Sequence, residues 1–240
     1  MQYASGDYII HCDSDDWVDL NFYESMYKKA VETNADVICA SIVWEYEDIK
    51  KKAKKITPVI TNNISDYIQK NFGKHLNGLV SKLYKKAIAL NPTVSCPDSI
   101  CMGEDLLRNI QMLDKCKNIA FAADVYYHYW QNYTSVTHNF TETHFDNIQK
   151  IIAFIDNNFP GKYLKICFNL KANMFLGALL YLHRNDRLRL LFLENWKNIS
   201  FHDKIRIIKT GKGSFKGKIC LIAACLSPSL AIFLLRFIFN

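Results

Sequence analysis

Three closely spaced carboxylates, Asp13, Asp15 and Asp16, directly follow the apolar run 8–12 near the start of this 240-residue chain. Mg²⁺ and Mn²⁺ prefer oxygen ligands, and they need only one or two protein carboxylates when a diphosphate and water complete the coordination shell. The Asp-x-Asp pair therefore predicts a divalent-cation site beside a phosphate-bearing ligand, with Asp13 and Asp15 as the metal ligands. Asp16 would reach the site around the turn, and Trp17 would cover it.

Three other interpretations of this acidic run must be weighed. A phosphatase of the aspartyl-phosphate type would need Thr or Val where Trp17 stands. An EF-hand calcium loop would use Asp13, Asp15 and Glu24 at its positions 1, 3 and 12, but Val18 stands where that loop needs a glycine. A cluster of solvated acids at the N-terminus of the following helix would need no ligand at all. The spacing of the acids does not by itself decide between these interpretations.

A second acidic pair, Glu104 and Asp105, begins the amphipathic stretch 104–115. Acids in the first turn of a helix interact favourably with its dipole, which is the simplest explanation of the pair. A carboxylate in this place could also serve as a general base, because it can remove a proton from a hydroxyl group within hydrogen-bonding distance.

The elements around these acids predict a layered α/β fold. A strand over 8–12, a helix over 19–34 and a strand over 36–43 form a strand–helix–strand unit. Further helices are expected, as are two further strands. The helical ranges are 65–72, 79–90 and 104–115, and the strand ranges are 119–123 and 125–130.

The second half of the chain has helical periodicity and few strand signals. We therefore divide the sequence into an α/β core (1–137), a helical extension (138–209) and a basic hinge followed by an apolar tail (210–240). Helices are expected over 141–157, 163–183, 185–196 and 200–209. Ser200 and Asp203 resemble a capping box at the start of the last of these.

The charge of the chain is concentrated at its C-terminus. Residues 201–240 carry seven Lys or Arg and one acid, Asp203, whereas the rest of the chain is nearly neutral. This distribution argues against a nucleic-acid-binding face on the core. The 21 residues 219–239 are mostly apolar and follow this basic segment, so the tail is expected to lie as a helical hairpin on an anionic membrane surface. Packing onto the core and spanning the bilayer are the alternatives.

Four segments together resemble glycosyltransferase family 2, the inverting enzymes with the GT-A fold. They occur in the family's order over residues 4–137 and include the acidic run with its preceding strand. The others are Ser81-Lys82-Leu83-Tyr84, Gly103-Glu104-Asp105, and Tyr126-Tyr127-His128-Tyr129 with Ser135. Each segment is weak evidence alone, but their order makes the match specific.

The resemblance implies roles for individual residues. Asp13, Asp15 and Asp16, with Trp17 and Lys82, would bind a nucleotide sugar, such as a UDP-sugar, through Mn²⁺ or Mg²⁺. Asp105 would be the catalytic base that deprotonates a saccharide or lipid-linked acceptor, and Glu104 would orient it. Transfer would invert the anomeric carbon and would serve surface polysaccharide synthesis.

The sequence departs from this family in two places. First, the strand–helix–strand half that binds the base and ribose is expected to be missing, since Met1 falls where the family already approaches the acidic strand. Second, Trp130 stands where an Arg is expected. A catalytically inactive, membrane-associated binding or accessory module is therefore the alternative function. Eight cysteines without a CxxC pair indicate a reducing compartment. The expected location is the cytoplasm, peripheral to the inner face of the cell membrane.

Overall fold

The chain folds into two compact units. The computed structural model describes residues 3–47, 51–61, 63–91, 93–131, 140–179, 181–182, 185–210, 215–227, 230–231 and 233–234. The first unit, here called the sheet unit, comprises 1–98 and 103–135, and the second, the helical unit, comprises 99–102 and 136–240. Each unit has its own hydrophobic core. Ser135 of the predicted motif lies outside the described residues.

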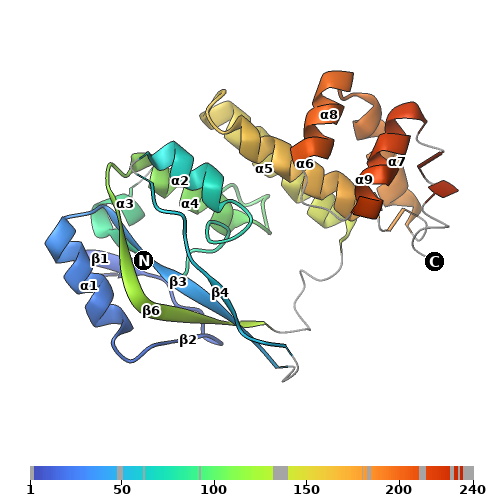
Figure 1. Ribbon diagram of the computed structural model, residues 1–240. Coiled ribbons are helices and arrows are strands. Elements are labelled where there is room, and N and C mark those ends of the chain that lie inside the picture. The colour runs from blue at the N-terminus through green and yellow to red at the C-terminus, as the bar shows by residue number, and fades with distance from the viewer. Residues whose placement is uncertain are drawn as a thin grey trace. The chain divides into compact units, whose positions relative to one another are not determined.

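A six-stranded mixed sheet forms the centre of the sheet unit (Figure 1). The strands are β1 (Tyr8–Ile10), β2 (Trp17–Val18), β3 (Val37–Tyr46), β4 (Lys54–Ile56), β5 (Lys82–Lys85) and β6 (Ile119–Gln131). Their order is β1-β5-β3-β6-β2, with β4 beside β3. Only the β3–β6 pair is parallel among these pairings. The loop between β1 and β2, which carries the acidic run, therefore connects the two ends of this strand order.

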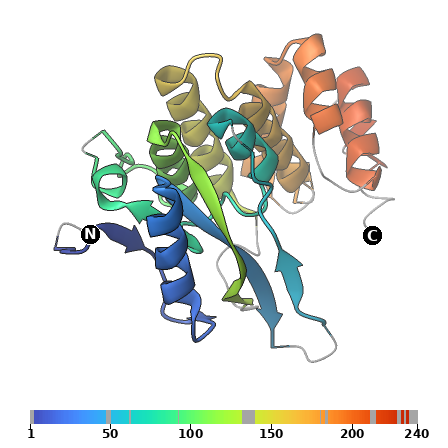
Figure 2. The ribbon, with the colours of Figure 1, turned by 60° about the vertical axis from the view of Figure 1, so that its left-hand side comes forward.

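The predicted strand–helix–strand unit is present as β1, α1 (Phe22–Thr33) and β3. Strand β5 lies between β1 and β3 and is antiparallel to both, so β1 and β3 run in the same direction. Helix α1 lies along β3 and β6 (Figure 2). Its residues Phe22, Met26 and Ala30 are buried at a spacing of four, which gives one apolar stripe facing the sheet.

The predicted helix over 79–90 is wrong for its first part. Residues Lys82–Lys85 form strand β5, and only the short helix α3 (Lys86–Ala89) follows it. The first three residues of β5 are all buried, so side chains on both faces of the strand are covered. A strand covered on both faces lacks the polar–apolar alternation by which a strand is normally recognised.

The other predicted elements of the sheet unit are confirmed with small changes. Helix α2 (Ile64–Asn71) and helix α4 (Glu104–Lys115) occupy the expected positions. The two strands predicted on either side of Asp124 are one strand, β6, in which Asp124 has a positive φ of 59°. The register of β6 against β3 also shifts here. The sequence break at Asp124 thus marks a local bulge and not a turn.

The helical unit contains the four predicted helices. These are α5 (Glu142–Asn158), α6 (Leu164–Leu179), α7 (Asp186–Lys197) and α8 (Phe201–Thr210). Their core is aromatic, with Phe175 contacting Phe192 and Trp196 edge to face. The Ser200 hydroxyl accepts the Asp203 amide at 3.1 Å, as the predicted cap requires.

A fifth helix, α9 (Phe215–Leu226), covers the end of the predicted hinge and the start of the apolar tail. It begins inside the predicted hinge, and one side of it packs on the helical unit. Cys220, Leu221 and Ala224 are buried, and the Trp196 indole N–H donates to the Ala224 carbonyl oxygen at 3.0 Å. The start of the apolar tail is therefore part of the unit's core. Among the described residues, no helix has the length and apolar character that crossing a bilayer requires.

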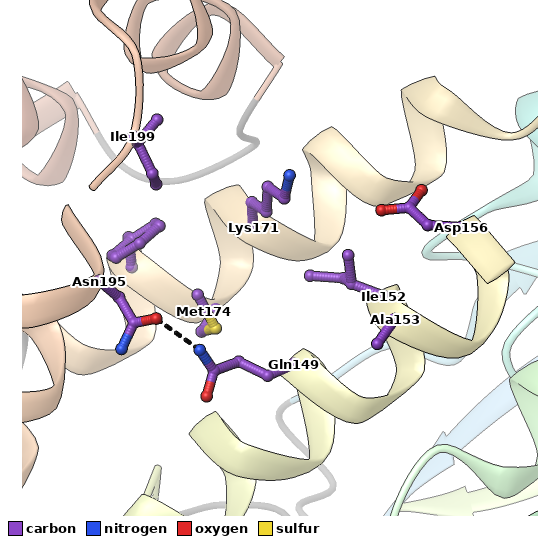
Figure 3. Close-up of a pocket in the computed structure, with 9 residues that line it drawn as sticks. Gln149, Ile152, Ala153, Asp156, Lys171, Met174, Asn195 and Ile199 are labelled. Carbon is purple, nitrogen blue, oxygen red and sulfur yellow. Dashed lines mark hydrogen bonds between the residues drawn. The ribbon is translucent and has the colours of Figure 1, made fainter. Parts of the chain in front are cut away.

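The helical unit also contains an open cavity of about 270 Å³ (Figure 3). Gln149 on α5 donates to Asn195 on α7 at 2.6 Å at its edge. The lining is Gln149, Ile152, Ala153, Asp156, Lys171, Met174, Phe175, Asn195 and Ile199. One acid and one lysine give this lining no net charge.

Candidate functional site

The acidic loop is held in place by strand β6, through the buried Tyr127 and the backbone of Trp130. The Asp16 carboxylate accepts two hydrogen bonds, from the Tyr127 hydroxyl at 2.7 Å and from the Trp130 amide at 2.9 Å. The same Tyr127 oxygen accepts the Asp13 amide at 3.0 Å. Both oxygens of Asp16 are thus engaged by the protein, and its contribution is to fix the shape of the loop.

Asp13 and Asp15 present exposed carboxylates at the turn of this loop. Neither carboxylate has a hydrogen-bond partner among the described residues. Partial burial, and then the negative charges of Asp105 and Asp15, raise the pKa of Asp13 above its ordinary value. Basic groups oppose this effect only in part, since His11 lowers the pKa of Asp13 and Arg108 lowers that of Asp105, yet both pKa values stay raised. The loop thus brings like charges together, an arrangement that a bound cation would stabilise.

Asp105 comes to this cluster from the first turn of α4. Its helix starts after Gly103, whose φ of 83° turns the chain into the helix in the left-handed region that glycine adopts at no cost. The Leu79 amide donates to the Asp105 carboxylate. Burial, and then the charge of Glu104, raise the pKa of Asp105, which makes its carboxylate a stronger base.

Glu104 affects this site through its negative charge, which raises the pKa of Asp105. The described residues include no hydrogen bond between Glu104 and Asp105, and the Glu104 Oε2 atom is buried with no partner. Asp105 is oriented by the Leu79 amide, whereas the Glu104 charge affects its proton affinity. The orienting role of Glu104 stays a prediction.

Lys82 lies fully buried at the start of β5. Its ammonium donates to the carbonyl oxygens of Gly78 at 2.7 Å and Val80 at 3.3 Å. Burial lowers the pKa of Lys82 to about 8, against the opposing charges of Cys39 and Asp105. Because both carbonyl oxygens belong to the segment 78–80, Lys82 holds this segment and with it the Leu79 amide that positions Asp105. None of the Lys82 surface is exposed.

Asn109 is a positioning residue that the sequence analysis missed. Its amide nitrogen donates to the carbonyl oxygens of Leu76 at 2.7 Å and Gly78 at 2.6 Å, and its amide oxygen accepts the Tyr84 hydroxyl at 2.9 Å. Asn109 is completely buried on the same helix as Asp105. A polar residue on the apolar side of the amphipathic stretch 104–115 was the available signal.

Trp17 lies beside the loop and stacks on a histidine of β6. The rings of Trp17 and His128 are 5.3 Å apart at 7°, and those of Trp17 and Trp130 are 6.1 Å apart at 47°. The His128 imidazole bonds to Glu45 at 2.8 Å and to Asp19 at 3.1 Å. Its burial lowers the pKa of His128, but these two carboxylates outweigh it and raise that pKa.

The side chains at the loop fit a divalent cation that brings most of its own ligands. No group of three or more His, Cys, Asp or Glu side chains within the described ranges is arranged to hold an ion. Asp13 and Asp15 offer two hard oxygen ligands, and a diphosphate with water could supply the others. Such an ion would lower the charge repulsion between Asp13, Asp15 and Asp105.

Comparisons with known proteins show which sequence family the first part of the chain resembles. Residues 1–92 match the family model described as Glycosyl transferase family 2. The cholesterol galactosyltransferase of Borreliella burgdorferi is 22% identical over 153 residues, which cover 59% of this chain and 42% of that protein. The chain thus spans about two fifths of the length of this curated relative.

Solved structures share the fold of the chain. The crystal structure of an S. aureus TarS fragment in complex with UDP-GlcNAc matches with a TM-score of 0.60 at 13% identity, over 99% of this chain and 68% of that one. A second TarS crystal structure matches with a TM-score of 0.57 at 13% identity, over 98% of this chain and 41% of that chain. These matches confirm the predicted α/β, GT-A-type fold.

Proposed function

We propose that this chain, a glycosyltransferase of family 2, transfers a sugar from a nucleotide-sugar donor to a saccharide or lipid-linked acceptor with inversion at the anomeric carbon. The observation that supports this most is the shared electrostatic cluster of Asp13 and Asp105, which come from distant segments of the sheet unit. One is a candidate ligand for the cation that accompanies a diphosphate, and the other is a candidate base. If these roles hold, their proximity would bring donor and acceptor chemistry together.

Asp105 removes the proton of the acceptor hydroxyl in this proposal. An alcohol is a weak nucleophile, and a carboxylate of raised pKa within hydrogen-bonding distance takes its proton as the new bond forms. Lys82 and Asn109 fix the segment 76–80, whose Leu79 amide keeps the carboxylate in place. Inversion follows if this hydroxyl attacks the donor sugar from the side opposite the leaving diphosphate.

Asp13 and Asp15 hold Mn²⁺ or Mg²⁺ in this proposal, and the bound ion would offset the charge that develops on the leaving diphosphate. Asp16 keeps the loop in shape through Tyr127 and Trp130. A UDP-sugar is the proposed donor, because the TarS structure of the same fold is described in complex with UDP-GlcNAc. Surface polysaccharide synthesis is the proposed setting.

Calorimetric titration of the chain with a UDP-sugar in the presence and absence of Mn²⁺ tests this function. We expect binding that requires Mn²⁺ and that falls at least about tenfold in Asp15→Ala, since each 1.4 kcal/mol of lost interaction is a factor of ten. Glu32→Ala, which removes an exposed acid of α1, is the matched control. Absence of binding, or equal binding by Asp15→Ala, would leave the accessory module as the function.

We propose further that the exposed side of α9 binds an anionic membrane surface at the inner face of the cell membrane. Phe215, Ile222 and Leu226 are 80%, 51% and 80% exposed. They follow one another at seven and four residues, so they share one side of the helix. Basic side chains of the same segment include Lys204, Arg206, Lys209, Lys216 and Lys218. Each such charge contributes roughly 1 kcal/mol near an anionic surface.

Co-sedimentation with vesicles tests the membrane proposal. We expect binding to vesicles of phosphatidylcholine with phosphatidylglycerol, weak binding to phosphatidylcholine alone, and loss of binding in Leu226→Ser. Leu190→Ser, which changes a 63% exposed leucine of α7, is the control. Equal loss in both variants, or equal binding to both vesicles, would contradict a specific role for α9.

A further inference from the structure

Two tryptophans form an exposed aromatic surface next to the acidic loop, which we call the aromatic shelf and define as Trp17, His128 and Trp130. Trp17 is 44% exposed, although it stacks on His128. The rings of Trp17 and Trp130 meet at 47°, so they form an open corner and not a flat stack. An indole with this much surface in water is costly unless something covers it.

The shelf is held rigidly by polar contacts below it. His128, on which Trp17 rests, bonds through both ring nitrogens to Glu45 and Asp19. Asp19 in turn accepts the Tyr126 amide at 2.8 Å. These bonds fix the imidazole plane and therefore the plane of the indole stacked on it. A binding surface whose side chains are already in place loses little conformational entropy when a ligand arrives.

The shelf is joined to the acidic loop at two points. Trp17 directly follows Asp16 in the chain, and the Trp130 amide donates to the Asp16 carboxylate at 2.9 Å. The antiparallel pairing of β2 with β6 places Trp17 opposite His128. A ligand on the shelf would therefore lie beside the loop that we propose binds the donor.

The charges around the shelf indicate what kind of ligand it fits. Among the described residues, Asp16, Asp19 and Glu45 lie next to the shelf, and the basic groups in contact with β6 here are His128 itself and Lys55, which bonds to Tyr126. A diphosphate or a polyanionic chain would be repelled by this surplus of carboxylates. A pyranose ring suits it, because its apolar C–H face can cover an indole while its hydroxyl groups donate to carboxylates and exchange hydrogen bonds with water.

We propose that the aromatic shelf is a subsite for one pyranose ring of a neutral saccharide acceptor. The assignment of the bound saccharide as an acceptor rests on the proposed function. Binding of the saccharide to the shelf does not, because it needs neither the donor nor the metal. The Trp at position 130, where the resemblance leads one to expect an Arg, is then a specificity feature of this chain. It replaces an anion contact by a second aromatic wall.

Nuclear magnetic resonance of the indole N–H groups tests the proposal directly. The chain has four tryptophans, so its ¹⁵N-labelled form gives four indole peaks, which Trp17→Phe and Trp130→Phe assign. The probes are methyl β-galactoside, methyl β-glucoside and methyl N-acetyl-β-glucosaminide, with methyl β-glucuronide as the anionic comparison. We expect saturable shifts of the Trp17 and Trp130 peaks by a neutral glycoside, with a dissociation constant on the order of millimolar.

The other two tryptophans serve as internal controls. Trp196 is completely buried in the helical unit, and Trp44 lies on β3 with Lys54 over its ring. Both peaks should stay in place when the glycoside is added. Their unchanged positions in the variants also show that both units remain folded. Trp130→Ala should weaken binding about tenfold or more, whereas Tyr3→Ala, which removes a 93% exposed tyrosine, should leave it unchanged.

Several results would overturn the proposal. These are no shift with any neutral glycoside, equal shifts of all four peaks, or stronger binding of the glucuronide. Saccharide binding without any binding of a UDP-sugar and Mn²⁺ would support the shelf and refute the proposed function. Binding of a UDP-sugar with Mn²⁺, without any shift of the Trp17 and Trp130 peaks by a glycoside, would support the proposed function and refute the shelf.

Discussion

Replacing Tyr127 by Phe removes one oxygen atom that fixes the acidic loop at two points. The hydroxyl donates to the Asp16 carboxylate at 2.7 Å and accepts the Asp13 amide at 3.0 Å. A hydrogen bond to a charged group contributes about 1.5–3 kcal/mol, and a neutral one about 0.5–1.5 kcal/mol. Because the loop is partly exposed and water can replace the lost partners, we expect the lower end, a loss of about 2 kcal/mol.

Urea unfolding of a double-mutant cycle measures this contribution. The variants are Tyr127→Phe, Asp16→Ala and the two combined, and the tryptophans of the sheet unit report its unfolding. With a denaturant dependence of about 2 kcal/mol per molar, Tyr127→Phe should lower the urea midpoint by about 1 M. The coupling energy between the two positions should be about 1.5 kcal/mol. A coupling below about 0.5 kcal/mol would show that Tyr127 does not fix the loop.

Three further changes test the electrostatics and packing. His128 has a raised pKa in the folded chain, so its contribution to stability is complete below pH 6.5 and is lost as the pH rises through its folded-state pKa. His128→Gln should abolish this loss of unfolding free energy in urea titrations above pH 6.5. Asp36 is partly buried, yet hydrogen bonds from the Lys117 and Asn118 amides and from Lys85 lower its pKa; Asp36→Asn should therefore remove a stability loss that the parent shows as the pH falls below 3.8. Gly177→Ala would place a methyl group 2.5 Å from the Phe140 ring. It should lower the free energy of unfolding of the helical unit by about 1–3 kcal/mol, which is measured as a lower melting temperature. An unchanged melting temperature would show that Phe140 moves aside freely.

The elements that the sequence predicts well are those with one buried face. The stripe of Phe22, Met26 and Ala30 and the amphipathic stretch 104–115 have a helical period because only one side of each helix meets the core. Strand β5 was mistaken for a helix because Lys82, Leu83 and Tyr84 are all buried, and a buried lysine gives no sign of a strand. The packing of α9 on Trp196 is a long-range contact that hydropathy cannot reveal.

The candidate site could be proposed from its residue types, but the contacts of each carboxylate could not. The acidic run and Glu104-Asp105 were found from their types and order, and the structure brings Asp13 and Asp105 into one cluster. Which of three neighbouring carboxylates is engaged by the protein depends on Tyr127, which lies 111 residues after Asp16. The pairing of Trp17 with His128 depends likewise on the register of β2 against β6.

The most direct test of the central claim is to observe the reaction at the anomeric carbon of a UDP-sugar by NMR with Mn²⁺ and a saccharide acceptor. The account predicts release of UDP and a product of inverted anomeric configuration. In Asp105→Asn, donor binding should persist while turnover falls by a factor of about 100 or more, the usual contribution of a general base. Turnover of Asp105→Asn within about tenfold of the parent, or a product of retained configuration, would contradict the account.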